Sequence, residues 1–436
     1  MKPKPPFSML AAVAALLLVA LTSAAQAAAP PQARAATAEQ KLAVFDRVFR
    51  DVRDLYYDPR FNGADWTAIG ARYRPLASAA PDDEALLVVL RSMLGELRDA
   101  HTRILTAAQM RDRRAQEALS AGAILFEVEG VAVVYAVVPG SPAAEAGLRP
   151  GMRVVAVGGI PVAAALAEAR SSIGASSSER AALLLAYRRL VSPPGEQPLR
   201  LGLVGADGAA IQVTLPRRRL DARPRFEARL LPGGALYIRF DRFRAPVARQ
   251  FRAALEQHRS ASGLVLDLRA NGGGDAEEGM KTVAPLFAAP TLVARLATRT
   301  GRPPSALFGL IRFPMELSAG RAGAQLFAGP VVVLVDEGTA STSEIVAASL
   351  QERGRARIVG ARSCGCALGV LRYRRLPNGA ALAISEVGLL SGLGRRIEGE
   401  GVVPDVAVPL RLGDLQSGRD AALAAGVRLL ADAAGP

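Results

Sequence analysis

Strands and helices alternate along the second half of the sequence, and this pattern limits the fold more than any other feature. From Gly234 onward, short apolar runs predict strands over residues 235–240, 264–268, 331–335 and 358–360. The segments between them predict helices over 246–258, 276–287 and 343–353. Such alternation indicates a sheet with helices on its faces, and the loops at the strand ends are then the expected place for catalytic groups.

The residues before Gly234 predict two smaller regions of different character. Apolar side chains recur at helical spacing over 42–56 and 82–97, whereas from about Ser120 the apolar period becomes two. Half of the 436 residues are hydrophobic, which is enough for more than one packed domain. We therefore expect a mixed α+β and α/β multidomain protein, with a helical N-terminal cap (38–117), a β-rich module (118–218), an α/β core (219–412) and a C-terminal helix (413–436).

The first residues have the layout of an export signal. Lys2 and Lys4 precede an unbroken apolar run from Met9 to Leu21, and an A-x-A cleavage site follows at 25–27. This run is shorter than the roughly 20 residues that span a bilayer, which disfavours the alternative of an uncleaved membrane anchor. We expect residues 1–27 to be a cleaved signal peptide. The mature chain, with no later stretch apolar enough to span a membrane, is then expected to be periplasmic or secreted.

The formal net charge of +14 does not indicate a nucleic-acid partner. The basic residues are scattered, apart from a cluster at 217–219, and few aromatic residues are interleaved with them. The sequence contains neither a metal-ligand cluster nor a phosphate-binding loop, so we expect no cofactor and no metal. Lysine is scarce and occurs only at Lys2, Lys4, Lys41 and Lys281.

One segment of the predicted core has the residues of a nucleophile turn. The apolar strand 331–335 leads into a turn containing Gly338, and Ser341 then opens the next helix. This arrangement exposes a hydroxyl beside free amides at a helix N-terminus, and such amides stabilise a developing oxyanion. Ser341 and Glu344 also fit the S-x-x-E capping box, which is a purely structural explanation of the same residues.

Four stretches of the core resemble the C-terminal-processing (tail-specific) serine proteases. They are LDLRANGGG at 266–274, ASTSE at 340–344, the segment 350–360, and GEGVVPD at 399–405. The resemblance implies a crotonase-like protease core that hydrolyses peptide bonds through an acyl-enzyme on Ser341. It also implies an oxyanion hole formed by the amide of Thr342 and one amide from Gly272, Gly273 or Gly274. A tight turn after a buried strand is the alternative explanation of these glycines.

The sequence departs from that family where most members carry a lysine base, in a T-x-G-K segment. Here the segment is SCGC at 363–366, so Cys366 occupies the lysine position, and a thiol does not simply replace a desolvated amine. A related branch, the tricorn-like peptidases, uses Ser, His and Glu. Similarity to that branch implies Ser341 as nucleophile, His101 as general base and Glu398 as the group that orients the imidazole.

Several alternatives to this triad remain. Lys281 is a candidate for a relocated base, Glu400 competes with Glu398, and His258 is the other histidine. His101 could instead be a structural histidine that holds the cap to the core. A catalytically inactive homologue that only binds peptide tails is the alternative function.

The segment 138–159 resembles the PDZ domains of bacterial proteases, with Met152 in place of the aspartate usual there. Such domains bind a peptide end by adding it to a sheet as a strand, and backbone amides hold its carboxylate. The resemblance implies that Gly122, Ala123 and Ile124 form the peptide-binding loop. The expected partners are unstructured protein or peptide C-termini, and the alternative is a spacer without a ligand.

The two cysteines, Cys364 and Cys366, lie in a chain that we expect in an oxidising compartment. A strained disulfide and two free thiols are both compatible with this spacing. A redox protein is a third hypothesis, but the C-x-C spacing lacks the C-x-x-C pattern of thioredoxin-like sites. The resemblance to the tail-specific proteases and the predicted signal peptide together imply an exported serine endopeptidase of that type.

Overall fold

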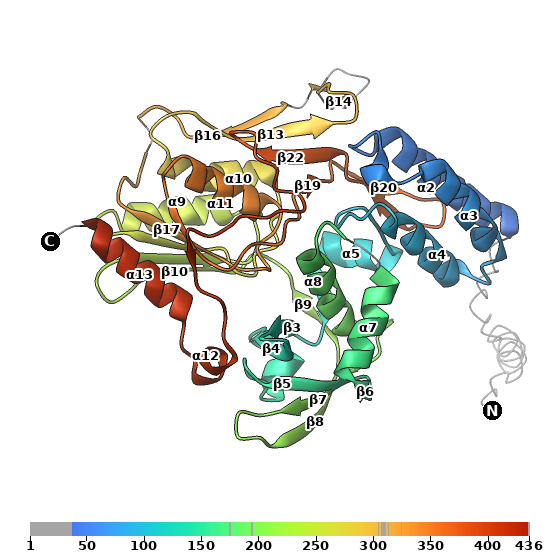
Figure 1. Cartoon of the computed structure of the whole chain (residues 1–436), viewed down its shortest axis with the longest axis horizontal. Coiled ribbons are helices and arrows are strands. Elements are labelled where there is room, and N and C mark those ends of the chain that lie inside the picture. Colours follow the sequence, from blue (N-terminus) through green and yellow to red (C-terminus); the bar gives the residue numbers. More distant parts are fainter. Residues whose placement is uncertain are drawn as a thin grey trace, which may run out of the picture.

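The computed structural model describes residues 37–173, 176–192, 195–303, 305–306, 311–312, 314–323 and 325–434. The predicted signal peptide, 1–27, lies outside these residues. Within the described part of the chain, no helix has both the length and the apolar character needed to cross a membrane. Figure 1 shows an N-terminal helical region, a β-rich module below it, and a larger α/β region formed by the second half of the chain.

The N-terminal region is a helical cap with its own apolar core. It contains α2 (Ala38–Leu55), the short 3-10 helix η1 (Phe61–Gly63), α3 (Trp66–Ala79) and α4 (Asp83–Gly95). Thr37, Asp65 and Asp82 cap the three α-helices with side-chain oxygens, as their positions just before apolar periodic segments favour. Their inward faces bury residues such as Val48 and Leu90 completely.

A hairpin from the far end of the sequence completes this cap. β1 (Arg103–Leu105) pairs with β21 (Ala381–Ala383), which pairs in turn with β20 (Tyr373–Arg375). Leu376, Leu382 and Ile384 belong to the cap's apolar cluster. The expected core range 219–412 therefore includes a hairpin whose apolar side chains are buried against the cap helices.

Short elements connect the cap to the β-rich module. α5 (Ala107–Ala115) leads into β2 (Glu117–Ser120), and β2 pairs antiparallel with β9 (Arg218–Asp221). The segments by which the chain enters and leaves the module, β2 and β9, therefore lie side by side.

The module is an antiparallel sheet with two longer helices beside it. Its strand order is β3 (Ala123–Val128), β4 (Val131–Val137), β5 (Arg153–Val157), β7 (Leu199–Val204) and β8 (Ala210–Leu215). The remaining elements are α6 (Pro142–Glu145), β6 (Ile160–Pro161), α7 (Val162–Ile173) and α8 (Glu179–Leu190). β3 lies at the edge of the sheet and contacts α8, so a groove between the two is bordered by an unpaired strand edge.

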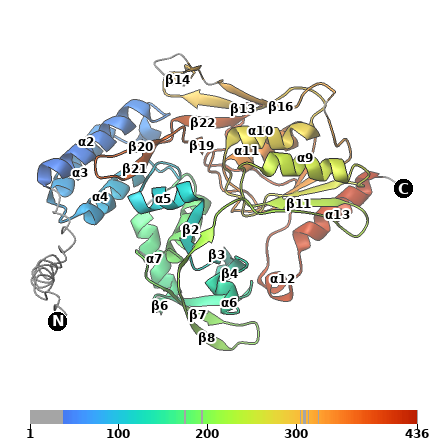
Figure 2. The same cartoon turned by 180° about the vertical axis from the view of Figure 1, so that it is seen from behind.

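The core contains the predicted sheet with helices on both faces. The strand order is β10 (Phe226–Leu230), β11 (Leu236–Phe240), β12 (Leu264–Asp267), β17 (Val331–Val335), β18 (Arg357–Gly360) and β23 (Val406–Ala407), and all pairs from β11 onward are parallel. α9 (Val247–Gln257), α10 (Ala276–Val283) and α11 (Thr342–Glu352) cover one face, and α13 (Ala421–Ala434) covers the other (Figures 1 and 2). Every residue of β17 is buried, as the uninterrupted apolar run of a central parallel strand requires.

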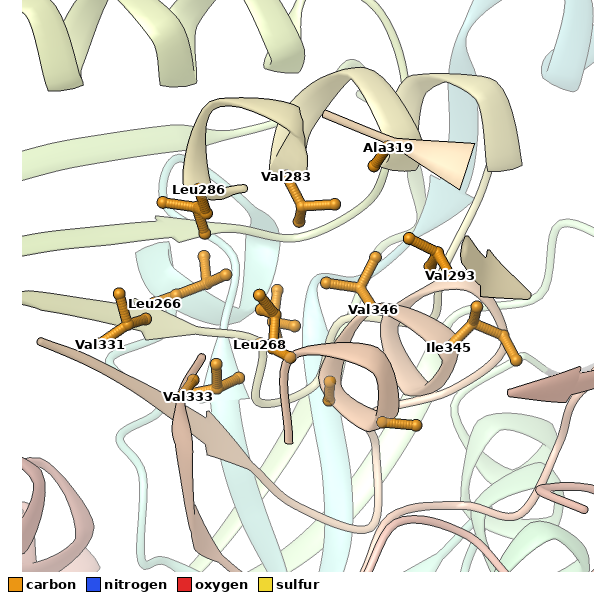
Figure 3. Packing of buried hydrophobic residues seen from close by; sticks show 14 of the residues in the cluster. Leu266, Leu268, Val283, Leu286, Val293, Ala319, Val331, Val333, Ile345 and Val346 are labelled. Carbon is orange, nitrogen blue, oxygen red and sulfur yellow. The ribbon is translucent and has the colours of Figure 1, made fainter. Parts of the chain in front are cut away.

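Figure 3 shows how the first of these faces is packed. Leu266 and Val333 from the sheet meet Val283 of α10 and Val346 of α11 in one apolar cluster. β17 and the first turn of α11 are therefore both anchored in this cluster, and the turn between them has little freedom to move.

The structure differs from the predicted elements in three places. The expected helix over 276–287 ends at Val283 and continues as the 3-10 helix η2 (Ala284–Leu286), which contains Pro285. The expected single C-terminal helix is two, α12 (Leu412–Ser417) and α13, separated at Gly418 with a φ of 69°. A second sheet that we did not predict lies above the core, with the order β16 (Glu316–Ala319), β13 (Thr291–Thr298), β22 (Val387–Ser391) and β19 (Leu368–Gly369). A small separate pair, β14 (Ser305–Ala306) and β15 (Ile311–Arg312), adjoins this region.

Candidate active site

Ser341 lies in the turn between β17 and α11 and has an unusual backbone conformation. Its φ is 59° and its ψ is −122°, a region that residues with a side chain rarely occupy. Strain of this kind at a sharp strand-to-helix turn is typical of nucleophile elbows. Asn271 secures the turn, because its carbonyl accepts the Ala340 amide at 3.0 Å and its Oδ1 accepts the Ser343 hydroxyl at 2.9 Å.

The predicted oxyanion-hole residues lie directly against this turn. A Cβ atom added to Gly273 would come within 2.7 Å of Ser341 Cβ and 2.9 Å of the Thr342 amide nitrogen, and Gly273 has a φ of 85°. Only glycine allows this approach. The Gly273 amide donates to Asn271 Oδ1 at 3.0 Å. The amides of Gly272 and Thr342 donate to no acceptor in the described part of the chain, so they remain able to bind an oxyanion.

Gly274 has a different place from the other two glycines. A Cβ atom there would collide with the Phe243 backbone, and the Gly274 carbonyl accepts the Thr342 hydroxyl at 3.0 Å. Gly274 therefore supports the turn through its carbonyl oxygen.

Glu344 is a hydrogen-bonding centre that the sequence did not identify as such. Its buried carboxylate accepts the Ser341 amide at 3.0 Å, the Ser363 hydroxyl at 2.6 Å, and the amides of Gly365 and Cys366 at 2.7 and 2.9 Å. The Glu344 amide donates to the Ser341 carbonyl at 2.9 Å, so the Ser341 hydroxyl is not required as a cap. Burial raises the pKa of Glu344, and the four donors oppose that shift. The S-x-x-E pattern thus belongs to a larger network that ties the serine turn to the cysteine segment.

Cys364 and Cys366 form a disulfide, which resolves the alternative left open by their spacing. Their Cα atoms are 5.3 Å apart, and Gly365 between them has a φ of 74°, which allows the tight bend. In this structure the Cys366 sulfur is bonded to Cys364 and is not available as a base. Both cysteines are buried and pack beside Ala340.

His101 lies in the loop between α4 and β1 of the cap. Its amide donates to Asp99 Oδ1 at 2.6 Å, and Asp99 also accepts the Thr102 hydroxyl. Burial lowers the pKa of His101 to about 4, although nearby Asp99 opposes this shift. The ring nitrogen Nδ1 is buried and has no hydrogen-bond partner among the described residues. The imidazole is therefore neutral at neutral pH, but burial makes it a weaker base than a solvated histidine.

Glu398 is buried, with 7% of its surface exposed, whereas the rival Glu400 is exposed. Its Oε2 accepts the Ala367 amide at 2.6 Å, and burial raises its pKa to about 8. The Ser177 hydroxyl opposes that shift and also accepts the amide of Ala100, the neighbour of His101, at 3.1 Å. Ser177 therefore links Glu398 to the His101 loop.

No hydrogen bonds join the three side chains of the predicted triad among the described residues. Within the described residues, the His101 ring donates to and accepts from neither Ser341 nor Glu398. Hydrogen bonds of catalytic groups are often long or absent without substrate. The alternative base Lys281 is 60% exposed on α10 and pairs with Glu277 at 2.6 Å, which raises its pKa. A base needs the opposite shift.

The predicted peptide-binding residues border the groove of the module, with one exception. Ala123 and Ile124 line a cavity of about 230 Å³ between β3 and α8, together with Leu184 and Tyr187. The Gly122 amide is already used, because it donates to Ser120 Oγ at 3.0 Å. The groove is therefore present, but Gly122 does not offer a free amide to a peptide carboxylate.

The module is docked on the catalytic turns by contacts that the sequence did not predict. Tyr135 donates its hydroxyl to Asp336 at 2.7 Å. Ser178 and Arg180 of the α8 start donate to the carbonyls of Cys364 and Ser363 at 2.6 and 2.8 Å. These residues carry no motif, and only the three-dimensional structure brings them together.

Comparisons with known proteins identify the kinds of domain that the chain contains. The model of peptidase family S41 matches residues 234–408, that of the tricorn protease C1 domain matches 37–95, and that of the PDZ domain matches 133–186. A carboxyl-terminal-processing protease of Picosynechococcus is 30% identical over 388 residues, which cover 87% of this chain and 85% of the relative. The chain belongs to peptidase family S41.

Two further comparisons show which other members of the family this S41 peptidase resembles. A putative tricorn protease homolog of Streptomyces coelicolor is 28% identical over 403 residues, covering 88% of this chain and 32% of that protein. The solved structure of a photosystem II D1 C-terminal processing protease is 26% identical with a TM-score of 0.57, covering 85% of this chain and 93% of that one. The predicted fold class, with PDZ and protease domains, is confirmed, and the chain is a serine-type peptidase of the tail-specific type.

Proposed function

We propose that this peptidase cleaves unstructured polypeptides with Ser341 as nucleophile, His101 as general base and Glu398 as the group that orients His101. The observation that carries the proposal is the strained Ser341 turn, packed against Gly273 beside two free amides. The absence of a lysine at position 366, together with the exposed, paired state of Lys281, favours histidine as the base.

The reaction would follow the order of other acyl-transfer peptidases. Ser341 Oγ attacks the peptide carbonyl while its proton passes to the His101 ring, and the amides of Gly272 and Thr342 bind the oxyanion. The resulting imidazolium gives its proton to the departing amine, which leaves an ester on Ser341. A water molecule, deprotonated by His101, then hydrolyses this ester and releases the acid product.

This mechanism requires the His101 loop to approach Ser341 when substrate binds. Glu398 and Ser177 are the groups that would guide the loop, because Ser177 contacts both Glu398 and the backbone of Ala100. In its ionised form Glu398 would stabilise the imidazolium.

The PDZ groove would hold the substrate chain during cleavage. The free edge of β3 offers backbone groups for an added strand, and the apolar wall of α8 offers Leu184 and Tyr187 for side chains. This favours extended, unfolded segments and chain ends over folded proteins. The apolar stretch and A-x-A site before residue 28 support an exported, periplasmic or secreted enzyme.

The direct test is cleavage of unstructured peptides by the wild-type protein and by Ser341→Ala, followed by mass spectrometry. We expect turnover by the wild type and none by the variant. The competing function is a peptide-tail-binding protein without catalysis. Tight binding of tails with no cleavage by the wild type on any peptide would establish that alternative.

A further inference from the structure

Arg188 of α8 lies where the PDZ groove meets the protease core. It lines the 230 Å³ cavity described above, and residues of the core, including Ala270 and Gly338, line the same cavity. Its Nη2 atom is 3.6 Å from the point where a Cβ of Gly272 would be. Gly272 precedes Gly273, which packs on Ser341 Cβ. The guanidinium thus lies beside the proposed oxyanion hole.

This guanidinium has no protein partner in the part of the chain that the structure describes. No carboxylate forms an ion pair with Arg188, and no acceptor takes a hydrogen bond from it. Asp336 lines the same cavity, but its carboxylate accepts the hydroxyl of Tyr135 and backbone amides of the core. The Arg188 side chain is exposed to solvent and has no counter-charge among the described residues, so its guanidinium is available to an anionic ligand in the groove.

The surroundings of Arg188 are positively charged. Desolvation by the surrounding protein, together with Arg103 and Arg242, lowers the pKa of Arg188, although the side chain remains exposed to solvent. Arg103 donates to the His101 carbonyl, which is uncharged, whereas Arg242 pairs with Asp241 at 3.2 Å. Arg188 also opposes protonation of His101, since it lowers the pKa of that ring. The region therefore favours binding of an anion.

We propose that Arg188 is a specificity residue that binds a carboxylate of the substrate polypeptide close to the scissile bond. This inference rests on the proposed function of Ser341. A guanidinium binds a carboxylate through two parallel hydrogen bonds, which gives both charge and geometric selectivity. An extended chain advances about 3.3 Å per residue, so the carboxylate belongs to one of the first few residues beside the cleaved bond.

Two sources can supply this carboxylate, an Asp or Glu side chain or the terminal α-carboxylate of the substrate. Either would neutralise Arg188 and so remove part of the repulsion that disfavours the imidazolium of His101. A bound carboxylate would then favour the proton transfer from Ser341 as well as the position of the peptide.

The test uses one unstructured peptide sequence in four forms. Once the cleaved bond is mapped, the residue beside it is Glu or Gln, and the C-terminus is a free acid or an amide. Binding to full-length Ser341→Ala is measured by fluorescence anisotropy, and kcat/KM is measured with the active enzyme. Each is repeated with Arg188→Gln and with Arg189→Gln, a neighbour on the same helix that is also exposed but does not line the cavity, and thermal unfolding checks that both variants fold.

We expect a carboxylate form to be favoured by about 10-fold or more with Arg188 present, as for hydrogen bonds between charged groups. The preference should disappear in Arg188→Gln and persist in Arg189→Gln. A dependence on Glu against Gln identifies the side chain, and a dependence on acid against amide identifies the terminus. Equal use of all four forms, or a preference that survives Arg188→Gln, overturns the inference.

The binding measurement separates this inference from the catalytic proposal. If the wild type cleaves nothing but Arg188 still determines a binding preference for the free acid over the amide C-terminus, the catalytic proposal fails and the carboxylate site stands. If cleavage depends on Ser341 while Arg188→Gln changes no preference, only the carboxylate site fails.

Discussion

The two sides of the candidate active site are built in opposite ways. The Ser341 turn lies within one domain, between two elements anchored in the core, and Asn271 and Glu344 hold it with a set of short hydrogen bonds. His101 comes from a loop of a different domain, and its Nδ1 has no partner in the described chain. The proposed nucleophile is therefore preorganised, whereas the position of the proposed base depends on how the cap is docked on the core.

Because of this difference, some substitutions should lower both activity and stability, whereas others should lower activity alone. Changes in the Ser341 turn should damage chemistry and stability together, because the same hydrogen bonds serve both. Changes at His101 and Glu398 should damage chemistry with little loss of stability, or even with a gain, because these groups are buried with few partners.

The largest expected effect belongs to the base. His101→Ala should lower kcat/KM by about 10²–10⁴-fold, the usual contribution of a general base, with the free energy of unfolding nearly unchanged. Added imidazole should restore part of the activity. His258→Ala, at the end of α9, is the matched control and should behave as the wild type. Full activity of His101→Ala would move the search to a base not considered above.

Glu344→Gln should lower both the stability of the protein and its catalytic activity. All four groups around this carboxylate are donors, so the amide group of Gln would leave two of them without an acceptor. We expect a loss of about 2–5 kcal/mol in the free energy of unfolding by denaturant titration, from unsatisfied buried donors. A turn displaced by 1 Å can lower kcat by about 10²-fold.

Glu337→Gln is the matched control for Glu344→Gln. Glu337 lies in the same turn, but its side chain accepts no hydrogen bond from another described residue. Equal effects of the two substitutions on stability and kcat would show that the hydrogen bonds from the four donors to Glu344 contribute to neither.

Glu398→Gln should change the pH dependence. The wild-type carboxyl has a pKa of about 8, above its ordinary value, so it ionises in the folded protein only as the pH rises toward 8. If the ionised form assists His101, kcat/KM of the wild type rises over this range, and the variant, about 10-fold less active at pH 9, lacks this rise. Identical pH profiles of the two proteins would contradict the role of Glu398.

The same raised pKa makes a prediction for stability. Between pH 4.5 and about 8 the unfolded chain is ionised at Glu398 while the folded chain is still protonated, so wild-type stability falls as the pH rises. The variant should lose this dependence and become the more stable protein at alkaline pH. Denaturant titrations at several pH values measure the difference.

The smallest effect is expected at the disulfide. Replacing Cys364 and Cys366 together by Ala should lower the free energy of unfolding by about 1–3 kcal/mol, as for a short closed loop. The kcat/KM value should stay within about threefold, a change of under 1 kcal/mol. Loss of activity here, with activity retained in Ser341→Ala, would instead favour the redox hypothesis.

The sequence allowed prediction of those parts of the site that are contiguous in the chain. Ser341, Thr342 and the glycines 272–274 lie in motifs, and the strand before Ser341 is an unbroken apolar run. Glu344 was interpreted only as a cap, because three of its four donors come from residues 363–366, distant in sequence. The turn residues 377–379 predict the hairpin of β20 and β21, but nothing local predicts its packing on the cap. Arg188 gave no local signal, since its place also arises from docking between domains.

The most direct test of the account follows the acylation step itself. A serine-reactive fluorophosphonate is added to the wild type, His101→Ala and Ser341→Ala, and the rate of adduct formation is followed by intact mass. We predict a single adduct on Ser341 in the wild type, none there in Ser341→Ala, and labelling at least about 10²-fold slower in His101→Ala. Labelling of Ser341 at the same rate with and without His101 would contradict the central claim that a histidine from the cap activates a serine of the core.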